Sequence, residues 1–300
     1  MAAAACNLLV IASLVGSSLG CNTPPSSLEE ELLEQQAQAV IEDNGLATNG
    51  LATNGLATNG LATNGLTTSS FSSWFGAAPA TNAQLMKYLI GCAVPEGQVR
   101  TYTDPNTGQS YTWAGKLGLA SNWGSGRAAT EQEEQVISAC LAAHANPYGM
   151  KVGFSILGLN AEGVEIPFTA QELGDFNVRE ACFFGNLFRG QGLYAGNDRT
   201  QLDSSKSTNR GCGLSGVSNG ENPVCPAIVR FGACDSSHCV PDATGTYYTQ
   251  CTYNGVSYRP VTTRLQATSV NTCGDGFCQV SEQCGVGKSA DNCSDCGACP

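Results

Sequence analysis

The cysteines are the residues of this chain whose chemistry is easiest to infer. There are 16 of them in 300 residues, a frequency that is uncommon in a reducing cytosol, so we expect an exported protein with disulfide bonds. Setting aside Cys6 and Cys21 leaves two even groups, which predict four bridges in the first and three in the second, with the connectivity open. The first group is Cys92, Cys140, Cys182, Cys212, Cys225, Cys234, Cys239 and Cys251, and the second is Cys273, Cys278, Cys284, Cys293, Cys296 and Cys299.

Residues near the C-terminus also offer ligands for a metal ion. Thiolates at the spacing of Cys293, Cys296 and Cys299 are able to bind zinc or an iron–sulfur cluster, but export through an oxidising compartment favours disulfides. Four carboxylates in the same segment supply the hard oxygen ligands that calcium prefers, although the spacing of an EF-hand is absent. We therefore predict no cofactor, with calcium as the alternative. The four carboxylates are Asp275, Glu282, Asp291 and Asp295.

Two patterns match those of catalytic nucleophiles. Residues 216–220 read Gly-Val-Ser-Asn-Gly, and Asp235 and His238 follow in the order of a catalytic triad, but the pattern lies in a glycine-rich loop rather than between a strand and a helix. Cys140 and His144 share a helix face, yet the even cysteine count predicts that Cys140 is paired and therefore not a nucleophile. We predict no catalytic residue from these patterns. A secreted hydrolase that uses carboxylates is the alternative, with Glu172, Asp175 and Glu180 as candidates.

The distribution of charge argues against nucleic acid as a partner. The net charge is -11 and no lysine or arginine precedes Lys87, while residues 82–271 are nearly neutral and carry no basic patch for phosphates. Aromatic side chains of this region either form a surface for an extracellular glycan or protein ligand or cover a hydrophobic core. They are Trp74, Trp113, Trp123, Tyr247, Tyr248 and Tyr253.

Residues 1–20 form an apolar run of the kind used as a secretory leader, and they end in Ser-Leu-Gly before Cys21. This segment resembles a bacterial lipoprotein signal peptide. The resemblance implies that Cys21 is lipidated, becomes the mature N-terminus and anchors the protein in a membrane. An ordinary cleaved leader and an uncleaved membrane anchor are the alternatives.

Residues 21–43 are acidic, and Ser26 precedes glutamates and a strip of apolar residues that together indicate a helical neck. Between Asn44 and Thr68 the unit Asn-Gly-Leu-Ala-Thr repeats in tandem. A pentapeptide solenoid would need a small inward residue where this repeat has asparagine, and the run is too short to bury a common core. We therefore predict a low-complexity, flexible linker over residues 44–80.

Residues 81–271 carry the local patterns of a mixed fold. One helix is predicted over residues 81–92, and a capping box at Thr130 predicts the start of a second helix. Each helix presents a cysteine on its apolar face, so we expect a Cys92–Cys140 bridge. Further patterns predict hairpins at 99–113 and 247–265, strands at 151–157 and 227–233, a helix from Thr169 through Leu187 and a loop at 190–220. Together they predict a disulfide-rich α+β domain of about three helices and about six strands.

Residues 272–300 form a small loop-rich module that begins with Cys-Gly-Asp-Gly-Phe-Cys. This module resembles the CGDGxC cysteine-rich modules of exported myxobacterial proteins, and with the leader and the Asn-Gly-Leu repeats the chain resembles surface lipoproteins of that group. The resemblance implies a location at the bacterial outer membrane or cell surface and carries no known reaction. We therefore expect a surface-anchored binding or structural lipoprotein, with the secreted hydrolase as the alternative.

Overall fold

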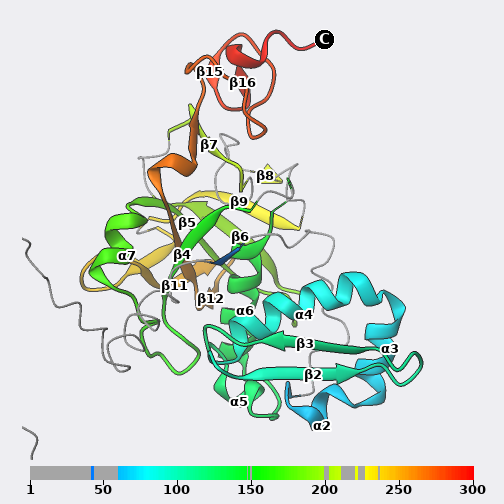
Figure 1. Cartoon of the computed structure of the whole chain (residues 1–300). Helices are drawn as coiled ribbons and strands as arrows, with labels where there is room; N and C mark the ends of the chain where they lie inside the picture. Colours follow the sequence, from blue (N-terminus) through cyan, green and yellow to red (C-terminus); the bar gives the residue numbers. More distant parts are fainter. Residues whose placement is uncertain are drawn as a thin grey trace, which may run out of the picture. The chain divides into compact units, whose positions relative to one another are not determined.

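Helices cover one face of the largest β-sheet and a smaller sheet covers the other (Figure 1). The computed structural model describes residues 42–43, 60–146, 148, 151–198, 203–210, 220–221, 227–235 and 237–300. Within these residues the prediction of a disulfide-rich α+β fold is confirmed. The helices are α2 (Thr63–Leu66), α3 (Ser69–Ala77), α4 (Pro79–Ala93), α5 (Ser121–Gly124), α6 (Glu131–His144) and α7 (Ala170–Asp175).

Helix α6 begins at the predicted capping box. The Thr130 hydroxyl accepts a hydrogen bond from the Glu133 amide (3.3 Å), and the Glu133 carboxylate accepts one from the Thr130 amide (2.8 Å). The second oxygen of Glu133 accepts the amides of Asn122 (2.7 Å) and Trp123 (3.1 Å), at the start of α5. One buried carboxylate therefore fixes the N-termini of two helices.

The end of the repeat belongs to the folded domain, which corrects the predicted linker over residues 44–80. Leu61 and Leu66 are 1% and 2% exposed, and the Leu61 amide donates to the Trp123 carbonyl (2.8 Å). Helix α3 follows directly and buries Phe71 and Phe75. The composition of the repeat indicates a linker, but it does not show that the leucines of the last copies contribute apolar surface to a core. The domain therefore begins at or before residue 60, and residues 44–59 lie outside the described residues.

Only the end of the predicted helical neck is described, and there the chain is a strand. Strand β1 (Glu42–Asp43) pairs antiparallel with β4 (Gly153–Gly158) at Phe154 and Gly153. The leader, Cys6, Cys21 and the rest of the neck lie outside the described residues.

The seven strands of the largest sheet run in the order β1-β4-β13-β5-β6-β9-β8. Neighbouring strands are antiparallel except β6 and β9, which are parallel. The remaining strands of this sheet are β5 (Val178–Asn186), β6 (Gly192–Asn197), β8 (Gly220–Glu221), β9 (Ile228–Ala233) and β13 (Val261–Leu265).

Strand β5 occupies much of the segment for which we predicted a helix through Leu187, so that prediction was wrong. Helix α7 ends at Asp175 and the strand begins at Val178. Ala181 and Phe183 pack in the core under the helices, whereas Cys182 and Phe184 pack in the core under the smaller sheet. Because both faces are buried, the strand lacks the alternation of polar and apolar residues that identifies a half-exposed strand.

Two further boundaries differ from the prediction. The segment 190–220, predicted as loop, contains β6 and also β7 (Lys206–Thr208). A Cβ atom on Gly196 of β6 would lie 2.9 Å from Cys234 Sγ, so this glycine permits close packing rather than marking a loop. The predicted strand 256–265 divides at Pro260, which has no amide hydrogen for a ladder, and the chain passes there from β12 to β13 of the large sheet.

The smaller sheet has the order β10-β11-β12 and packs on the large sheet through aromatic side chains. Its strands are β10 (Cys239–Pro241), β11 (Tyr248–Tyr253) and β12 (Val256–Tyr258). Cys239 is bonded to Cys251 within this sheet, and Cys182 of β5 is bonded to Cys234 beside it. The turn between β11 and β12 is the predicted two-residue one, with φ of 49° at Asn254 and 76° at Gly255.

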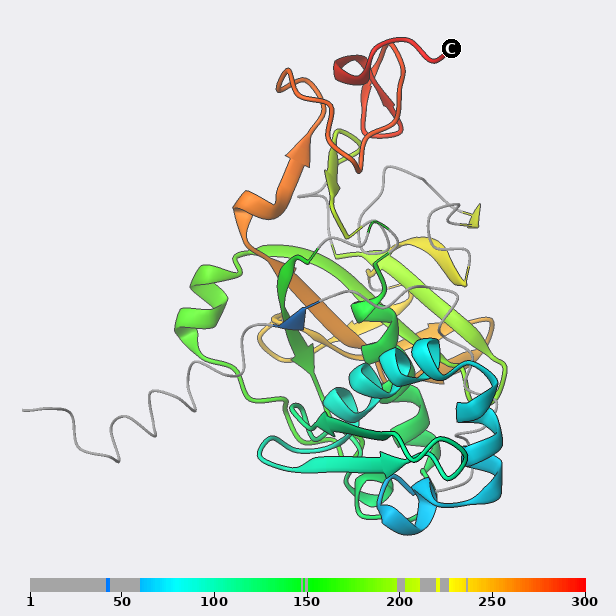
Figure 2. The same cartoon turned by 45° about the vertical axis from the view of Figure 1, so that its right-hand side comes forward.

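The C-terminal segment forms a small module cross-linked by three disulfides, Cys273–Cys293, Cys278–Cys296 and Cys284–Cys299. It follows β14 (Val270–Thr272), which pairs with β7, and contains β15 (Lys288–Ser289) and β16 (Asn292–Cys293) (Figure 2). Among the described helices, none combines the length and the apolar character needed to cross a membrane.

Candidate binding site

A groove lies between α4 and the hairpin formed by β2 (Val99–Thr103) and β3 (Ser110–Ala114), which are adjacent in Figures 1 and 2. Its volume is about 530 Å³, within the range of about 300–1,000 Å³ typical of small-molecule sites. The residues that line it are Ala83, Gln84, Lys87, Tyr88 and Gly91 from α4, and Thr112, Trp113, Ala114 and Lys116 from β3 and the residues after it.

The helical wall follows from the spacing of its residues. Ala83, Lys87 and Gly91 are four residues apart, so they form one stripe along α4. The opposite stripe, which includes Leu85, is buried in the core. The core side of α4 is held by the Cys92–Cys140 disulfide, which leaves the first stripe to face the groove.

The other wall is held in place by the hairpin and its aromatic neighbours. The Trp113 indole Nε1 donates to the Ala83 carbonyl of α4 (3.0 Å). The ring centroids of Trp113 and Tyr111 lie 6.1 Å apart, and that of Tyr111 lies 4.8 Å from Phe75. The Gly91 carbonyl accepts the Leu117 amide (2.8 Å), so helix and hairpin are joined at both ends of the groove.

The groove is positively charged in an acidic protein. Two of the five lysines of the chain, Lys87 and Lys116, line it, and none of its lining residues is a carboxylate. The Lys87 ammonium lies 5.3 Å from the centroid of the Tyr88 ring, within the range of a cation–π contact. Such a lining favours an anion that also offers an apolar face.

Of the six aromatic residues singled out from the sequence, only Trp113 lines this groove. Trp123 is fully buried, and Trp74 packs against the helical core. Tyr253 packs against Tyr194, with ring centroids 4.4 Å apart. Most of these aromatic residues therefore cover a hydrophobic core rather than form a surface for a ligand.

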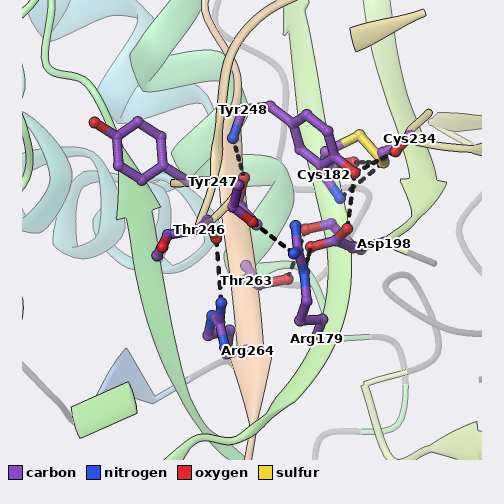
Figure 3. Close-up of polar contacts among 12 residues, drawn as sticks. Arg179, Cys182, Asp198, Cys234, Thr246, Tyr247, Tyr248, Thr263 and Arg264 are labelled. Atoms are coloured by element: carbon purple, nitrogen blue, oxygen red, sulfur yellow. Dashed lines mark hydrogen bonds and ion pairs between the residues drawn. A yellow bond between two sulfur atoms is a disulfide. The ribbon is translucent and has the colours of Figure 1, made fainter. Parts of the chain in front are cut away.

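Tyr247 and Tyr248 belong to a polar seam between the two sheets. The Tyr248 hydroxyl donates to Asp198 (2.8 Å) and to the Cys234 carbonyl, and Asp198 also accepts from Arg179 (2.7 Å), as Figure 3 shows. The Tyr247 hydroxyl donates to Glu165 (2.8 Å). Burial and, to a smaller extent, this hydrogen bond raise the pKa of Tyr247 to about 12.

Arg264 lies on the same seam. Its guanidinium donates to the Thr246 carbonyl (3.3 Å) (Figure 3). Burial is the main cause that lowers the pKa of Arg264, and the positive charge of Arg179 is the second. The seam pairs most of its polar groups between the sheets, while Arg179 Nη2 and Arg264 Nε are buried without a hydrogen-bond partner among the described residues. Its contacts indicate a structural role.

The three carboxylates considered for hydrolysis lie in unlike surroundings. Glu180 is buried in an ion pair with Arg210 (2.8 Å), and Asp175 is exposed. Glu172 is buried and accepts the Ser155 hydroxyl (2.6 Å). None of the three lines the groove, and a second cavity of about 280 Å³ contains one carboxylate, Glu131. Paired acids in a shared cleft, which the hydrolase would require, are not found in either of these two cavities.

Burial raises the pKa of Glu172, while the hydrogen bonds from Ser155 and Thr169 act in the opposite direction. The folded protein therefore takes up this proton more readily than the unfolded chain. The associated stability is present at low pH and is lost as the pH rises from the ordinary pKa of 4.5 towards the raised value.

The remaining catalytic patterns have no support in the described residues. Cys140 is bonded to Cys92, so the neighbouring His144 (Nδ1 to Cys140 Sγ, 3.8 Å) does not activate a thiol. Residues 216–219 lie outside the described residues, and Asp235 lies 3.7 Å from His238 in an exposed turn.

Twelve of the fourteen cysteines in the two groups form six disulfides, and each bridge stays within its own group. Cys212 and Cys225 lie outside the described residues. Three clusters combine cysteines with a histidine, carboxylate or third cysteine within 4.8 Å of one another. All the cysteines in these clusters are disulfide-bonded, so they offer no thiolate to a metal.

Sequence reasoning missed Gln84, Lys87, Gly91 and Lys116 as site residues. The predicted helix already placed Lys87 opposite its apolar face, which is the ordinary position of a solvated lysine. The groove exists only because a hairpin packs along that face, and no local pattern reports this contact.

The tandem repeat matches the GLTT repeat family in six copies over residues 44–71. The match covers the segment that ends in α2 and the start of α3, and it identifies a repeat-containing protein. Neither a curated protein nor a solved structure matches the chain.

Proposed function

We propose that this protein is a lipid-anchored surface protein whose disulfide-linked domain binds a carboxylate-bearing saccharide in the groove between α4 and β3. The observation that carries the proposal is the presence of Lys87 and Lys116 in a groove lined by no carboxylate, on a chain of net charge -11. Ammonium groups complement carboxylates. The proposed ligand therefore carries more than one negative charge.

The other lining groups favour a saccharide over a simple anion. The rings of Tyr88 and Trp113 provide apolar surface, while the Gln84 amide and the Thr112 hydroxyl provide hydrogen-bonding groups in the lining. A few polar groups set among aromatic surface are typical of sites that orient a small ring-shaped ligand.

The surface location is proposed on sequence features. The apolar residues 1–20 before Cys21, the repeat and the CGDGxC module resemble those of myxobacterial surface lipoproteins, and abundant disulfides agree with export. The outer membrane or cell surface is the proposed location, with Cys21 as the site of lipidation. In this arrangement residues 21–41 separate the domain from the membrane, because β1 (Glu42–Asp43) already pairs with β4 of the domain.

The groove is tested by calorimetry of the purified full-length protein with oligogalacturonate. We expect binding, and we expect Lys87→Gln and Lys116→Gln each to weaken it roughly tenfold, because a hydrogen bond to a charged group contributes about 1.5–3 kcal/mol. Lys288→Gln, in the C-terminal module, is the matched control and should leave the affinity unchanged. Equal losses in all three variants, or binding of polyglutamate but not of the saccharide, would contradict the proposal.

Gly91 offers a test that leaves the charge unchanged. A Cβ atom at this position would lie 3.9 Å from Lys116 Cδ, so alanine fits, and alanine in a helix should stabilise the domain by up to about 1 kcal/mol. Gly91→Ala should therefore keep binding, whereas the longer side chain of Gly91→Leu should fill the groove and abolish it in a folded protein. Unchanged binding by a folded Gly91→Leu variant would count against this groove.

The anchor is tested by labelling cells that produce the protein with radioactive palmitate. We expect the wild type and Cys6→Ser to incorporate label and to fractionate with membranes, and we expect Cys21→Ser to do neither, because Cys21 is the proposed acceptor. Labelling of Cys21→Ser, or its absence in the wild type, would remove lipidation from the proposal.

A further inference from the structure

Four cysteine sulfurs lie together where the smaller sheet packs on the large sheet. Cys182 of β5 is bonded to Cys234 (Figure 3), and Cys239 of β10 is bonded to Cys251 of β11. The Sγ atoms of Cys182 and Cys239 are not bonded to each other, but they lie only 3.7 Å apart. Cys234 Sγ lies within 4.8 Å of both of these atoms. Two disulfides are therefore in contact at this place.

This contact permits thiol–disulfide exchange. In such an exchange a thiolate attacks one sulfur of a disulfide and releases the other sulfur as a new thiolate. Opening of the Cys239–Cys251 bond would leave Cys239 as a thiol beside the intact Cys182–Cys234 bond. Because all four cysteines are buried, the nearest partner for this thiol is the other disulfide rather than a thiol in solvent.

The surroundings favour attack on Cys182, with Cys234 as the leaving group. The backbone amide of Cys182 donates to Cys234 Sγ (3.2 Å), and a hydrogen bond of this kind stabilises a thiolate. The sulfur that forms the more stable thiolate leaves faster. The Gly196 carbonyl lies 2.9 Å from Cys234 Sγ, so it can accept the thiol hydrogen once Cys234 is protonated.

The bond within the smaller sheet is the one that a reductant reaches more readily. Strand β10, which carries Cys239, has three residues and forms an edge of its sheet, and its middle residue, Val240, is 54% exposed. Cys182 instead lies in β5, which is paired on both sides, with β13 and β6. Short edge elements open locally at a lower free energy than central strands. Opening of β10 therefore exposes the Cys239–Cys251 bond without unfolding the large sheet.

We propose that these four cysteines form a disulfide-exchange site that takes an electron pair from a dithiol. One thiol of the dithiol attacks Cys251 Sγ, which breaks the Cys239–Cys251 bond and leaves Cys239 as a thiolate. This thiolate attacks Cys182 Sγ, forms a Cys182–Cys239 bond and releases Cys234. The second thiol of the dithiol then displaces Cys251 from the mixed disulfide. The dithiol leaves as a disulfide, and its two protons end on Cys234 and Cys251.

The exchange would change which parts of the domain are cross-linked. Among the described disulfides, none joins a strand of the smaller sheet to a strand of the large sheet. The new Cys182–Cys239 bond would link β5 of the large sheet to β10 of the smaller one. Reduction at this site would therefore fasten the smaller sheet to the large sheet instead of loosening it.

The experiment compares two variants of the full-length protein, purified without reductant, quenched with acid, unfolded in urea, labelled with N-ethylmaleimide and mapped by mass spectrometry of peptides. Cys251→Ala leaves Cys239 as a thiol, so we expect a Cys182–Cys239 bond and a shift of the label to Cys234. Cys239→Ala is the matched control, because Cys251 is not part of the cluster of three sulfurs; it should keep the Cys182–Cys234 bond and carry the label on Cys251. Label confined to Cys239 in Cys251→Ala, or on Cys234 to the same extent in both variants, would overturn the proposal.

A second measurement follows the wild type during partial reduction by dithiothreitol, with the same quench and labelling. The first cysteines to be labelled should be Cys234 and Cys251, together with a newly formed Cys182–Cys239 bond. The bridge between α4 and α6 is the internal control; it should stay intact, because its cluster holds no further cysteine. First labelling of Cys239 with Cys251, first labelling of Cys182 with Cys234, or reduction of the control bridge at the same rate would each contradict the exchange.

Discussion

Replacing Glu180 with glutamine is expected to destabilise the domain by about 3–5 kcal/mol. Glu180 and Arg210 are 0% and 1% exposed, and Glu180 Oε1 lies 2.8 Å from Arg210 Nε. The Arg210 guanidinium also lies 3.8 Å from the centroid of the Phe154 ring, within the apolar core under the helices. Glutamine would leave a buried cation without its counter-charge, which is the costly way to break a buried ion pair.

A second arginine, Arg230, increases the loss of stability expected when Glu180 is replaced. Burial lowers the pKa of Arg230 to about 10, and Glu180 acts in the opposite direction by stabilising the charged form. Arg230 donates to Asn197, so glutamine at position 180 would remove charge compensation from two guanidinium groups at once. Glu180 is thus the counter-charge of two buried guanidinium groups, Arg210 and Arg230.

Urea unfolding of the full-length protein under non-reducing conditions measures this loss. Glu131→Gln is the matched control, because Glu131 pairs with Arg189 at 3.4 Å while their side chains are 43% and 46% exposed. That change should be much smaller, since exposed ion pairs are screened by solvent. Similar shifts for the two variants would mean that the Glu180–Arg210 pair is not desolvated as the structure indicates.

Features encoded within a few residues of sequence could be predicted. The capping box at Thr130 and Glu133 and the turn at Asn254 and Gly255 fix their own geometry through local hydrogen bonds and backbone preference. The Cys92–Cys140 pair, which the structure joins, could be inferred because each cysteine lies on the apolar face of a helix.

Features set by distant packing could not be predicted from local pattern. Strand β5 is buried on both faces, so its apolar run resembles a helix as much as a strand. Leu61 has the same neighbours in sequence as the earlier leucines of the repeat, and Leu66 differs from them only in being followed by threonine. The burial of both leucines depends on helices that follow. The groove likewise depends on contacts between distant residues, namely Trp113 with Ala83, thirty residues apart, and Leu117 with Gly91.

Removing the Cys92–Cys140 disulfide, by Cys92→Ala with Cys140→Ala, is expected to cost about 4 kcal/mol, because the bond closes a loop of 48 residues in the unfolded chain. Single domains are stable by about 5–15 kcal/mol, so this variant should lose a large share of its stability. Thermal and urea unfolding with the other disulfides intact measure the loss. A change below about 1 kcal/mol would contradict the chain-entropy argument.

The same variant links the disulfide to the groove. Cys92 directly follows Gly91, so the bond to Cys140 holds the groove wall of α4 against α6. The control is Cys239→Ala with Cys251→Ala, which removes the bond within the smaller sheet and should cost about 3 kcal/mol for its separation of 12 residues. Both variants should lose stability, but only loss of Cys92–Cys140 should also weaken saccharide binding under conditions where both remain folded. Equal weakening would show that binding follows global stability rather than the position of α4.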